Sequence, residues 1–294
     1  MPAEALKRKI KTTNDLRDIV SNMKMLSSVS ILQYEQANKV LERYQRNLRD
    51  AFQVLAINNG IPNFNDKKNS DGKCLFILIG SDNGMVGRFN KEITEAAKKY
   101  QKENNFAAED VSCITLGKRL SVIAEQSRLK IVCGYAMPNA VKTVTLLAEA
   151  VILKMDEAMR REGINKVVVF YHRRKEHSGV ELKIRKLFPT DKNIIKNTIA
   201  KRWETNNIPM LPIDKHKMFA ALINEILMIA LSKEINSSLA AEHFTRMTNM
   251  QNAESNIDEK LEEMNLKYQQ QRQEEITDEL IDVISGSEAV NRKK

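Results

Sequence analysis

The sequence predicts an α/β domain inserted between two long terminal helices that pair into a rod, as an antiparallel coiled coil. Neither Ala3–Asn59 nor Lys217–Ser285 contains glycine or proline, whereas nine of the ten glycines and five of the six prolines lie between these runs. In that intervening part, short β-rich runs alternate with helical stretches, which is typical of a mostly parallel sheet covered by helices. We therefore expect an N-terminal helix over 1–59, a central Rossmann-like α/β domain over 60–212, and a C-terminal helix with its tip over 213–294.

The terminal runs are predicted to pair because apolar residues recur every three or four positions along each of them. The N-terminal stripe runs from Leu6 to Leu55. The C-terminal seam consists of Met247, Met250, Ile257, Leu261 and Met264, followed after a polar gap by Ile276, Leu280 and Val283. A buried Leu or Met stabilises by roughly 1.5–3 kcal/mol and an exposed ion pair by roughly 0–1 kcal/mol, so we expect the seam to hold the pair.

The central part is predicted to contain five strands and three helices. The strands are expected at Cys74–Ile79, Val111–Leu116, Lys130–Cys133, Val167–Tyr171 and Val180–Leu187, and the helices at Lys91–Lys102, Lys118–Gln126 and Thr143–Arg161. Too few residues separate the last two strands for a helix to lie between them. The last strand is therefore expected to be an antiparallel edge.

No motif in the sequence indicates catalysis, a cofactor or a metal ion. The loop from Gly80 to Gly87 lies between a predicted strand and a predicted helix, but it matches neither GxGxxG nor GxxxxGK[ST], so a structural turn is favoured over a phosphate loop. The four histidines have no HExxH spacing, and the three isolated cysteines are interpreted as buried, reduced thiols. We expect a non-catalytic chain.

The composition of the chain indicates which kinds of partner to expect, and whether the chain contains a membrane span or a signal peptide. The net charge is +9, but aromatic residues make up only 5% and no nucleic-acid-binding signature accompanies the basic residues, so contact with an acidic protein or a membrane face is favoured over nucleic acid. No apolar stretch approaches the 18 or so residues of a membrane span. The opening residues also lack the apolar region of a signal peptide.

Motifs spread over nearly the whole chain resemble those of the gamma subunit of rotary ATP synthases. They are Leu6-Lys7-Arg8-Lys9-Ile10-Lys11, Met23-Lys24-Met25, Ser81-Asp82-Asn83-Gly84, Ala241-Glu242-His243, Arg246-Met247, Met250, Tyr268, Arg272-Gln273, Ile276-Thr277 and Glu279-Leu280. The resemblance implies a central rotor shaft, one copy per complex, that couples ion flow across the membrane to nucleotide sites in an alpha/beta hexamer. It implies alpha, beta and epsilon subunits and a membrane c-ring as partners, and a peripheral position on the cytoplasmic face of a bacterial inner membrane.

The resemblance also assigns roles to individual residues. Arg272 and Gln273 match positions that contact the beta subunit, and Met23 and Lys24 match the shaft segment opposite them. The chain departs from the family in the loop after the first strand, where Asn83 replaces a usually basic residue and Val86 and Gly87 stand where a cysteine and paired glycines are common. Two other classes remain open at this point, a coiled-coil scaffold protein and a nucleotide-binding enzyme that uses the central sheet.

Overall fold

The computed structural model describes residues 3–58, 72–175, 179–189, 207, 209–211 and 213–291, with side chains described as far as residue 284. Packing divides the chain into two compact units, which we call the terminal unit (1–27 with 246–294) and the central unit (28–245). The boundaries expected at residues 59 and 212 do not coincide with this division. The reason is that the inner parts of both long helices pack with the sheet and belong to the central unit.

Both terminal runs form single long helices, as predicted. Helix α1 spans Ala3–Ile57 and helix α6 spans Lys215–Asn291. Helix α6 continues past its expected end at Ser285 and through Gly286. Glycine in a helix costs only about 1 kcal/mol relative to alanine, so it does not have to end a helix.

The central unit contains a five-stranded sheet in the order β3-β2-β1-β4-β5. The strands are β1 (Lys73–Ile79), β2 (Val111–Leu116), β3 (Ile131–Tyr135), β4 (Ile164–Arg174) and β5 (Val180–Phe188). The first four pair in parallel, and β5 is an antiparallel edge strand beside β4. The prediction of a mostly parallel sheet with an antiparallel last strand is confirmed. Strand β4 is longer than expected because Ile164 and Lys166 also pair with the start of β1.

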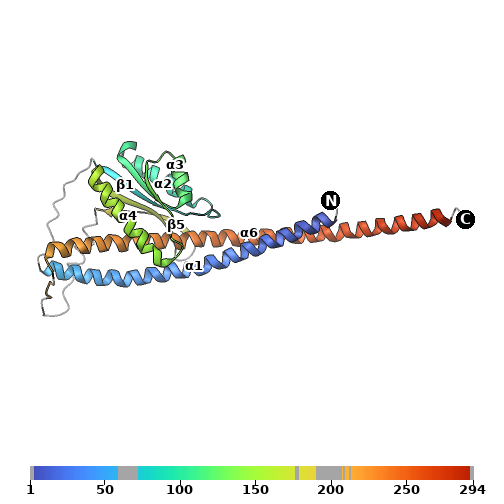
Figure 1. Ribbon diagram of the computed structural model, residues 1–294, viewed down its shortest axis with the longest axis horizontal. Helices are drawn as coiled ribbons and strands as arrows, with labels where there is room; N and C mark the ends of the chain where they lie inside the picture. Colours follow the sequence, from blue (N-terminus) through green and yellow to red (C-terminus); the bar gives the residue numbers. More distant parts are fainter. Residues whose placement is uncertain are drawn as a thin grey trace. The chain divides into compact units, whose positions relative to one another are not determined.

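Helices cover both faces of the sheet (Figure 1). Alternate residues of β1 point to opposite faces. The helices are α2 (Phe89–Glu103), α3 (Lys118–Gln126) and α4 (Val141–Glu162), with a short 3-10 turn η1 (Ala108–Asp110) before β2. Leu75, Ile77 and Ile79 pack in one core cluster with α4, α6 and Tyr34 of α1. Cys74, Phe76 and Leu78 pack in the other with α2 and α3. Helix α6 is therefore part of the core of the α/β domain.

Candidate functional site: paired helices and a filled sheet edge

In the terminal unit, α1 and α6 run antiparallel. Three polar contacts fix their register: Ala3 N to Glu275 Oε1 at 2.8 Å, Arg17 Nε to Asp258 Oδ1 at 2.6 Å, and Lys24 Nζ to the Glu254 carboxylate. Positions on α6 fall as positions on α1 rise, which is the pairing predicted from the sequence.

The apolar seam of this unit is narrow. Leu6 of α1 forms a buried cluster with Leu261 and Met264 of α6, and Ile10, Ile257 and Tyr268 pack against it. Of the other expected seam residues, Met250 is buried and Met247 is half-buried. Of the ion pairs beside this seam, Arg17–Asp258 is exposed and Lys24–Glu254 is half-buried, so apolar burial contributes most of the stability of the pair.

Arg272 and Gln273 lie outside the seam on the exposed surface of α6. The main-chain oxygen of Gln273 accepts a hydrogen bond from Thr277 Oγ1, and the Arg272 guanidinium forms no ion pair with any residue that the structure describes. A guanidinium in this position presents its planar set of donors outward and is free to bind an acidic or carbonyl-rich partner.

Met23 and Lys24 do not lie opposite Arg272 and Gln273 in the helical pair, and that expectation is corrected. The register places Lys24 beside Glu254, whereas the segment of α1 at the level of Arg272 is its first turn, since Ala3 bonds to Glu275. Eighteen positions separate Glu254 from Arg272, which corresponds to about 27 Å along a helix. Met23 and Lys24 are both half-buried.

The predicted continuation of the seam beyond Glu275 is also wrong. Helix α6 extends past the first residue of α1, so nothing on α1 lies opposite its last turns (Figure 1). The apolar residues there are exposed, namely Ile276, Leu280, Ile281, Val283 and Ile284. The sequence spacing was correct for a seam, but the partner helix begins too late to form one.

In the central unit the same two helices also pair antiparallel. Leu48, Phe52 and Leu55 of α1 form a buried cluster with Leu222 and Ile229 of α6. Polar contacts continue this register, with Lys233 Nζ 3.4 Å from Glu42 Oε1 and Asn38 Nδ2 3.0 Å from Ser237 Oγ.

Helix α6 fills the place where a sheet of this topology usually binds a ligand. In doubly wound sheets the crevice lies at the carboxyl ends of the strands, where the strand order reverses, which here is between β1 and β4. At that point Ser238 Oγ of α6 donates a buried hydrogen bond to the Ile79 main-chain oxygen at 3.2 Å. Ala241, on the next turn of α6, is fully buried among the core residues.

Asp82 occupies the position at the start of α3 where an anion would bind. Its Oδ1 accepts hydrogen bonds from the main-chain N–H of Lys118 at 2.8 Å and of Met137 at 3.0 Å. Helix N-termini bind phosphate through such N–H groups, so the carboxylate takes the place of a phosphate. The Asn90 carboxamide braces the same loop, accepting from Ser81 N at 2.9 Å and donating to Ser81 Oγ at 2.8 Å. The loop is thus a structural turn, as the sequence favoured.

An ion pair between a buried carboxylate and a half-exposed guanidinium joins α6 to the edge strand. Glu234 Oε1 lies 3.1 Å from Arg185 Nη1 of β5, and Oε2 is buried with no hydrogen-bond partner among the residues that the structure describes. Burial raises the pKa of Glu234 to about 7, against the opposing influence of Arg185 and Lys233.

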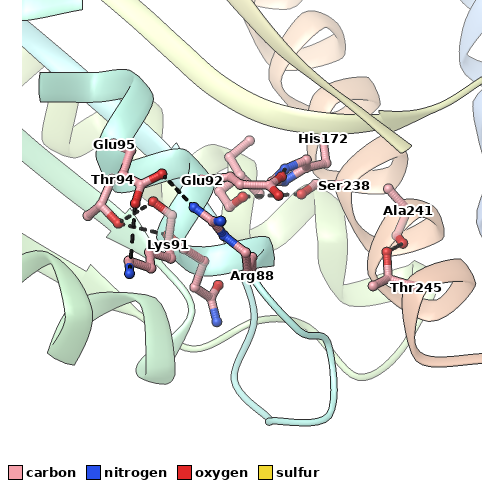
Figure 2. Close-up of polar contacts among 11 residues, drawn as sticks. Arg88, Lys91, Glu92, Thr94, Glu95, His172, Ser238, Ala241 and Thr245 are labelled. Carbon is pink, nitrogen blue, oxygen red and sulfur yellow. Dashed lines mark hydrogen bonds and ion pairs between the residues drawn. The ribbon is translucent and has the colours of Figure 1, made fainter. Parts of the chain in front are cut away.

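His172 of β4 is a further buried titratable residue, and it lies beside Glu92 of α2 (Figure 2). Its Nε2 lies 3.2 Å from Glu92 Oε2, and its ring stacks on Phe89 with 4.0 Å between centroids. Burial lowers the pKa of His172, and the hydrogen bond to Glu92 opposes that shift. A neutral imidazole is therefore favoured at neutral pH.

The described part of the chain holds no group of three or more His, Cys, Asp or Glu side chains placed to bind a metal ion. Burial raises the pKa values of Cys74 and Cys113 to about 12, which suppresses the thiolate forms that would react. His243, within α6, stacks on Tyr34 with 5.8 Å between centroids. No helix in the described ranges has an apolar stretch long enough to cross a bilayer.

The chain belongs to a class of protein in which an α/β domain is inserted between two long terminal helices. These helices pair antiparallel, and one of them fills the crevice of the domain. A family model described as ATP synthase matches residues 3–290, and the chain belongs to this family. An ATP synthase gamma chain from Geotalea uraniireducens is 28% identical over 296 residues and covers 98% of both chains. One from Campylobacter jejuni is 26% identical and covers 97% of this chain and 98% of its own. The resemblance to gamma subunits is confirmed.

Solved structures agree on the fold. A chain of the Euglena gracilis mitochondrial ATP synthase, in a structure of OSCP, F1 and the c-ring, aligns with a TM-score of 0.63 at 15% identity, covering 98% of this chain and 94% of its own. A chain from the central stalk and c-ring of the Tetrahymena thermophila enzyme aligns with a TM-score of 0.52 at 18% identity and covers 80% of this chain and 99% of its own.

Sequence reasoning did not single out the polar groups that fix α6 in the central unit. Glu234 is one charge among many on a long helix, and its burial depends on β5 passing beside it. Arg174 is another such group, since its Nη1 lies 2.6 Å from Glu35 Oε1 of α1 and its guanidinium lies over the Phe244 ring of α6.

Proposed function

We propose that this chain is the central rotor shaft of an ATP synthase, turning within an alpha/beta hexamer and coupling ion flow across a membrane to ATP synthesis or hydrolysis. One observation carries the proposal: α6 is both a core helix of the α/β domain and one half of the antiparallel pair. Rotation applied to the domain is thereby transmitted to the paired helices through a continuous backbone.

The chain performs no chemistry of its own in this proposal. Ser238 and Ala241 fill the crevice between β1 and β4, and Asp82 takes the hydrogen bonds that a phosphate would need at the start of α3. These contacts argue against nucleotide binding in the central unit. The chain instead acts on nucleotide sites elsewhere, through a surface that favours a different conformation in each subunit it faces.

Arg272 and Gln273 are proposed to contact a beta subunit. Both side chains are exposed on α6, away from the seam that binds α1. A contact made outward from such positions affects the partner without affecting the pairing of the two helices. Met23 and Lys24 are proposed to contribute to the same rotor surface at a different level, since their place on α1 is beside Glu254.

The proposed assembly contains alpha and beta subunits, an epsilon subunit and a membrane c-ring, with one copy of this chain. In it the chain is peripheral to the membrane, on the cytoplasmic face of a bacterial inner membrane. The bacterial gamma chains among its relatives support this location.

Co-expression with alpha and beta subunits of the same source tests the proposal directly. A stable complex with one copy of this chain, whose ATP hydrolysis drives rotation of a bead attached to the chain, is the expected result. A chain that is recovered free, or bound without rotating during hydrolysis, would show that it is not the shaft.

A further inference from the structure

The exposed turn after β1 contains two groups that can react with each other. Asn83 is exposed, and neither its carboxamide nor the main-chain N–H of Gly84 forms a hydrogen bond with a residue that the structure describes. The Asn83 main-chain oxygen, in contrast, is held by Ser81 Oγ at 2.9 Å. The peptide unit is therefore anchored at its oxygen, while both reacting groups remain accessible.

Nothing in the fold requires glycine at position 84. Its φ lies outside the left-handed range, unlike that of Gly87 at 58°, and a Cβ there would meet only the flexible Arg119 guanidinium, at 3.6 Å. The lack of a side chain does have a chemical effect, since it leaves the Gly84 nitrogen unhindered and its backbone free to rotate.

We propose that Asn83 is a site of spontaneous deamidation. The Gly84 nitrogen loses its proton and attacks the Asn83 side-chain carbonyl carbon, a C–N bond forms, and ammonia leaves to give a cyclic succinimide. Water then opens the ring at either carbonyl, giving aspartate or isoaspartate. The net change is one carboxylate in place of one carboxamide, with no oxidant or cofactor needed.

Other asparagines of the described chain lack this combination of features. Asn90 is buried, and both atoms of its carboxamide bond to Ser81. The exposed Asn104 donates from its side chain to the Tyr100 main-chain oxygen at 2.9 Å. A second Asn-Gly pair at residues 59–60 lies outside the described residues.

The product places a second carboxylate next to Asp82, whose oxygens already accept the Lys118 and Met137 N–H groups. The isoaspartate form also lengthens the main chain by one carbon in a turn where Met85 already has a φ of 63°. Both changes alter the surface of the α/β domain at the carboxyl edge of its sheet.

Incubating the folded full chain at mildly alkaline pH, followed by peptide mass mapping, tests the proposal. Conversion at Asn83, with isoaspartate and aspartate both present and with ammonia released, is expected to be at least several-fold faster than at Asn104. Gly84→Ala is the matched variant, and it should keep the melting temperature of the parent while losing most of the conversion at Asn83. Equal rates at Asn83 and Asn104 in the folded chain, or an unchanged Asn83 rate in the Gly84→Ala variant, would overturn the proposal.

Discussion

Individual buried polar residues couple α6 to the sheet and make the stability of the central unit depend on pH. The Glu234 carboxyl has lost its hydration and is compensated by one contact with Arg185. Removing one partner of a buried pair costs more than the pair contributes, because the other group stays buried and unpaired. The contribution of such a residue to the stability of the central unit therefore changes when the residue gains or loses a proton.

The raised pKa of Glu234 predicts a loss of stability as pH increases. The neutral form is favoured in the folded state, so its contribution to the free energy of unfolding is full below pH 4.5 and is lost as pH rises through about 7. The Glu234→Gln variant keeps the shape and the hydrogen bond but does not titrate. Its melting temperature, measured by calorimetry against pH, should decline less between pH 4.5 and 7 than that of the parent.

Two comparisons keep this measurement specific. The lowered pKa of His172 acts in the opposite sense, because the unfolded chain then binds more protons below about pH 6.5 and stability falls with acidification. The variant curve must therefore be subtracted from the parent curve. Glu259→Gln, at an exposed position of α6, is the control and should leave the pH profile unchanged. If the melting temperatures of Glu234→Gln and its parent changed with pH in parallel, Glu234 would not be the group responsible for the pH dependence.

Arg272 tests the proposed contact with the beta subunit. Arg272→Ala should leave assembly intact but weaken rotation-coupled ATP turnover, because the side chain lies outside the seam with α1. Turnover and complex stoichiometry would be measured on the assembled enzyme, with the exposed neighbour Glu274→Gln as control. Normal turnover in the Arg272 variant at full occupancy would remove the assigned role and leave the shaft proposal standing.

At the scale of elements, the narrow seam of the terminal unit has few residues and no sheet to support it. Leu6, Leu261 and Met264 form its buried centre. Loss of one of them removes a large part of the apolar burial between the two helices.

Leu261→Asp should therefore separate the helices of the terminal unit. A carboxylate placed against apolar partners costs several kcal/mol unless it is paired. Leu266→Asp on the same helix, at a position that is 58% exposed, should change stability by no more than about 0.5 kcal/mol. Hydrogen exchange of residues 3–27 measures both effects, and similar protection in the two variants would show that the seam is not what pairs the helices.

The elements that sequence patterns predicted are those with a strong local signal. The long helices, the mostly parallel sheet implied by alternation and the antiparallel edge all follow from periodicity and from where glycine and proline lie. Three details depended on partners that no local pattern contains: the burial of Glu234, the exposure of Ile276 to Ile284, and the level of Lys24 along α6. Arg272 and Gln273 were found by family resemblance, because an exposed polar pair on an acidic helix carries no signal of its own.

At the scale of the whole molecule, the filled crevice predicts that the isolated chain does not bind nucleotide. Calorimetry with ATP and Mg²⁺ should give no stoichiometric binding, and the purified chain should not hydrolyse ATP. An Asp82→Ala variant would be the informative comparison, since it frees the Lys118 and Met137 N–H groups. Stoichiometric ATP binding by the parent chain would contradict the proposed function.

Because α6 packs within the α/β domain, the order of synthesis matters. The sheet strands are complete once Phe188 has been made, but one of their faces is covered by Leu231, Ile235 and Leu239, which emerge later from the ribosome. A nascent chain that stops short of α6 leaves the face that carries Leu75, Ile77 and Ile79 only partly covered, by α4 and Tyr34, which favours aggregation. The domain in the middle of the sequence is thus expected to complete its fold only after this part of α6 has left the ribosome, long after its last strand has been made.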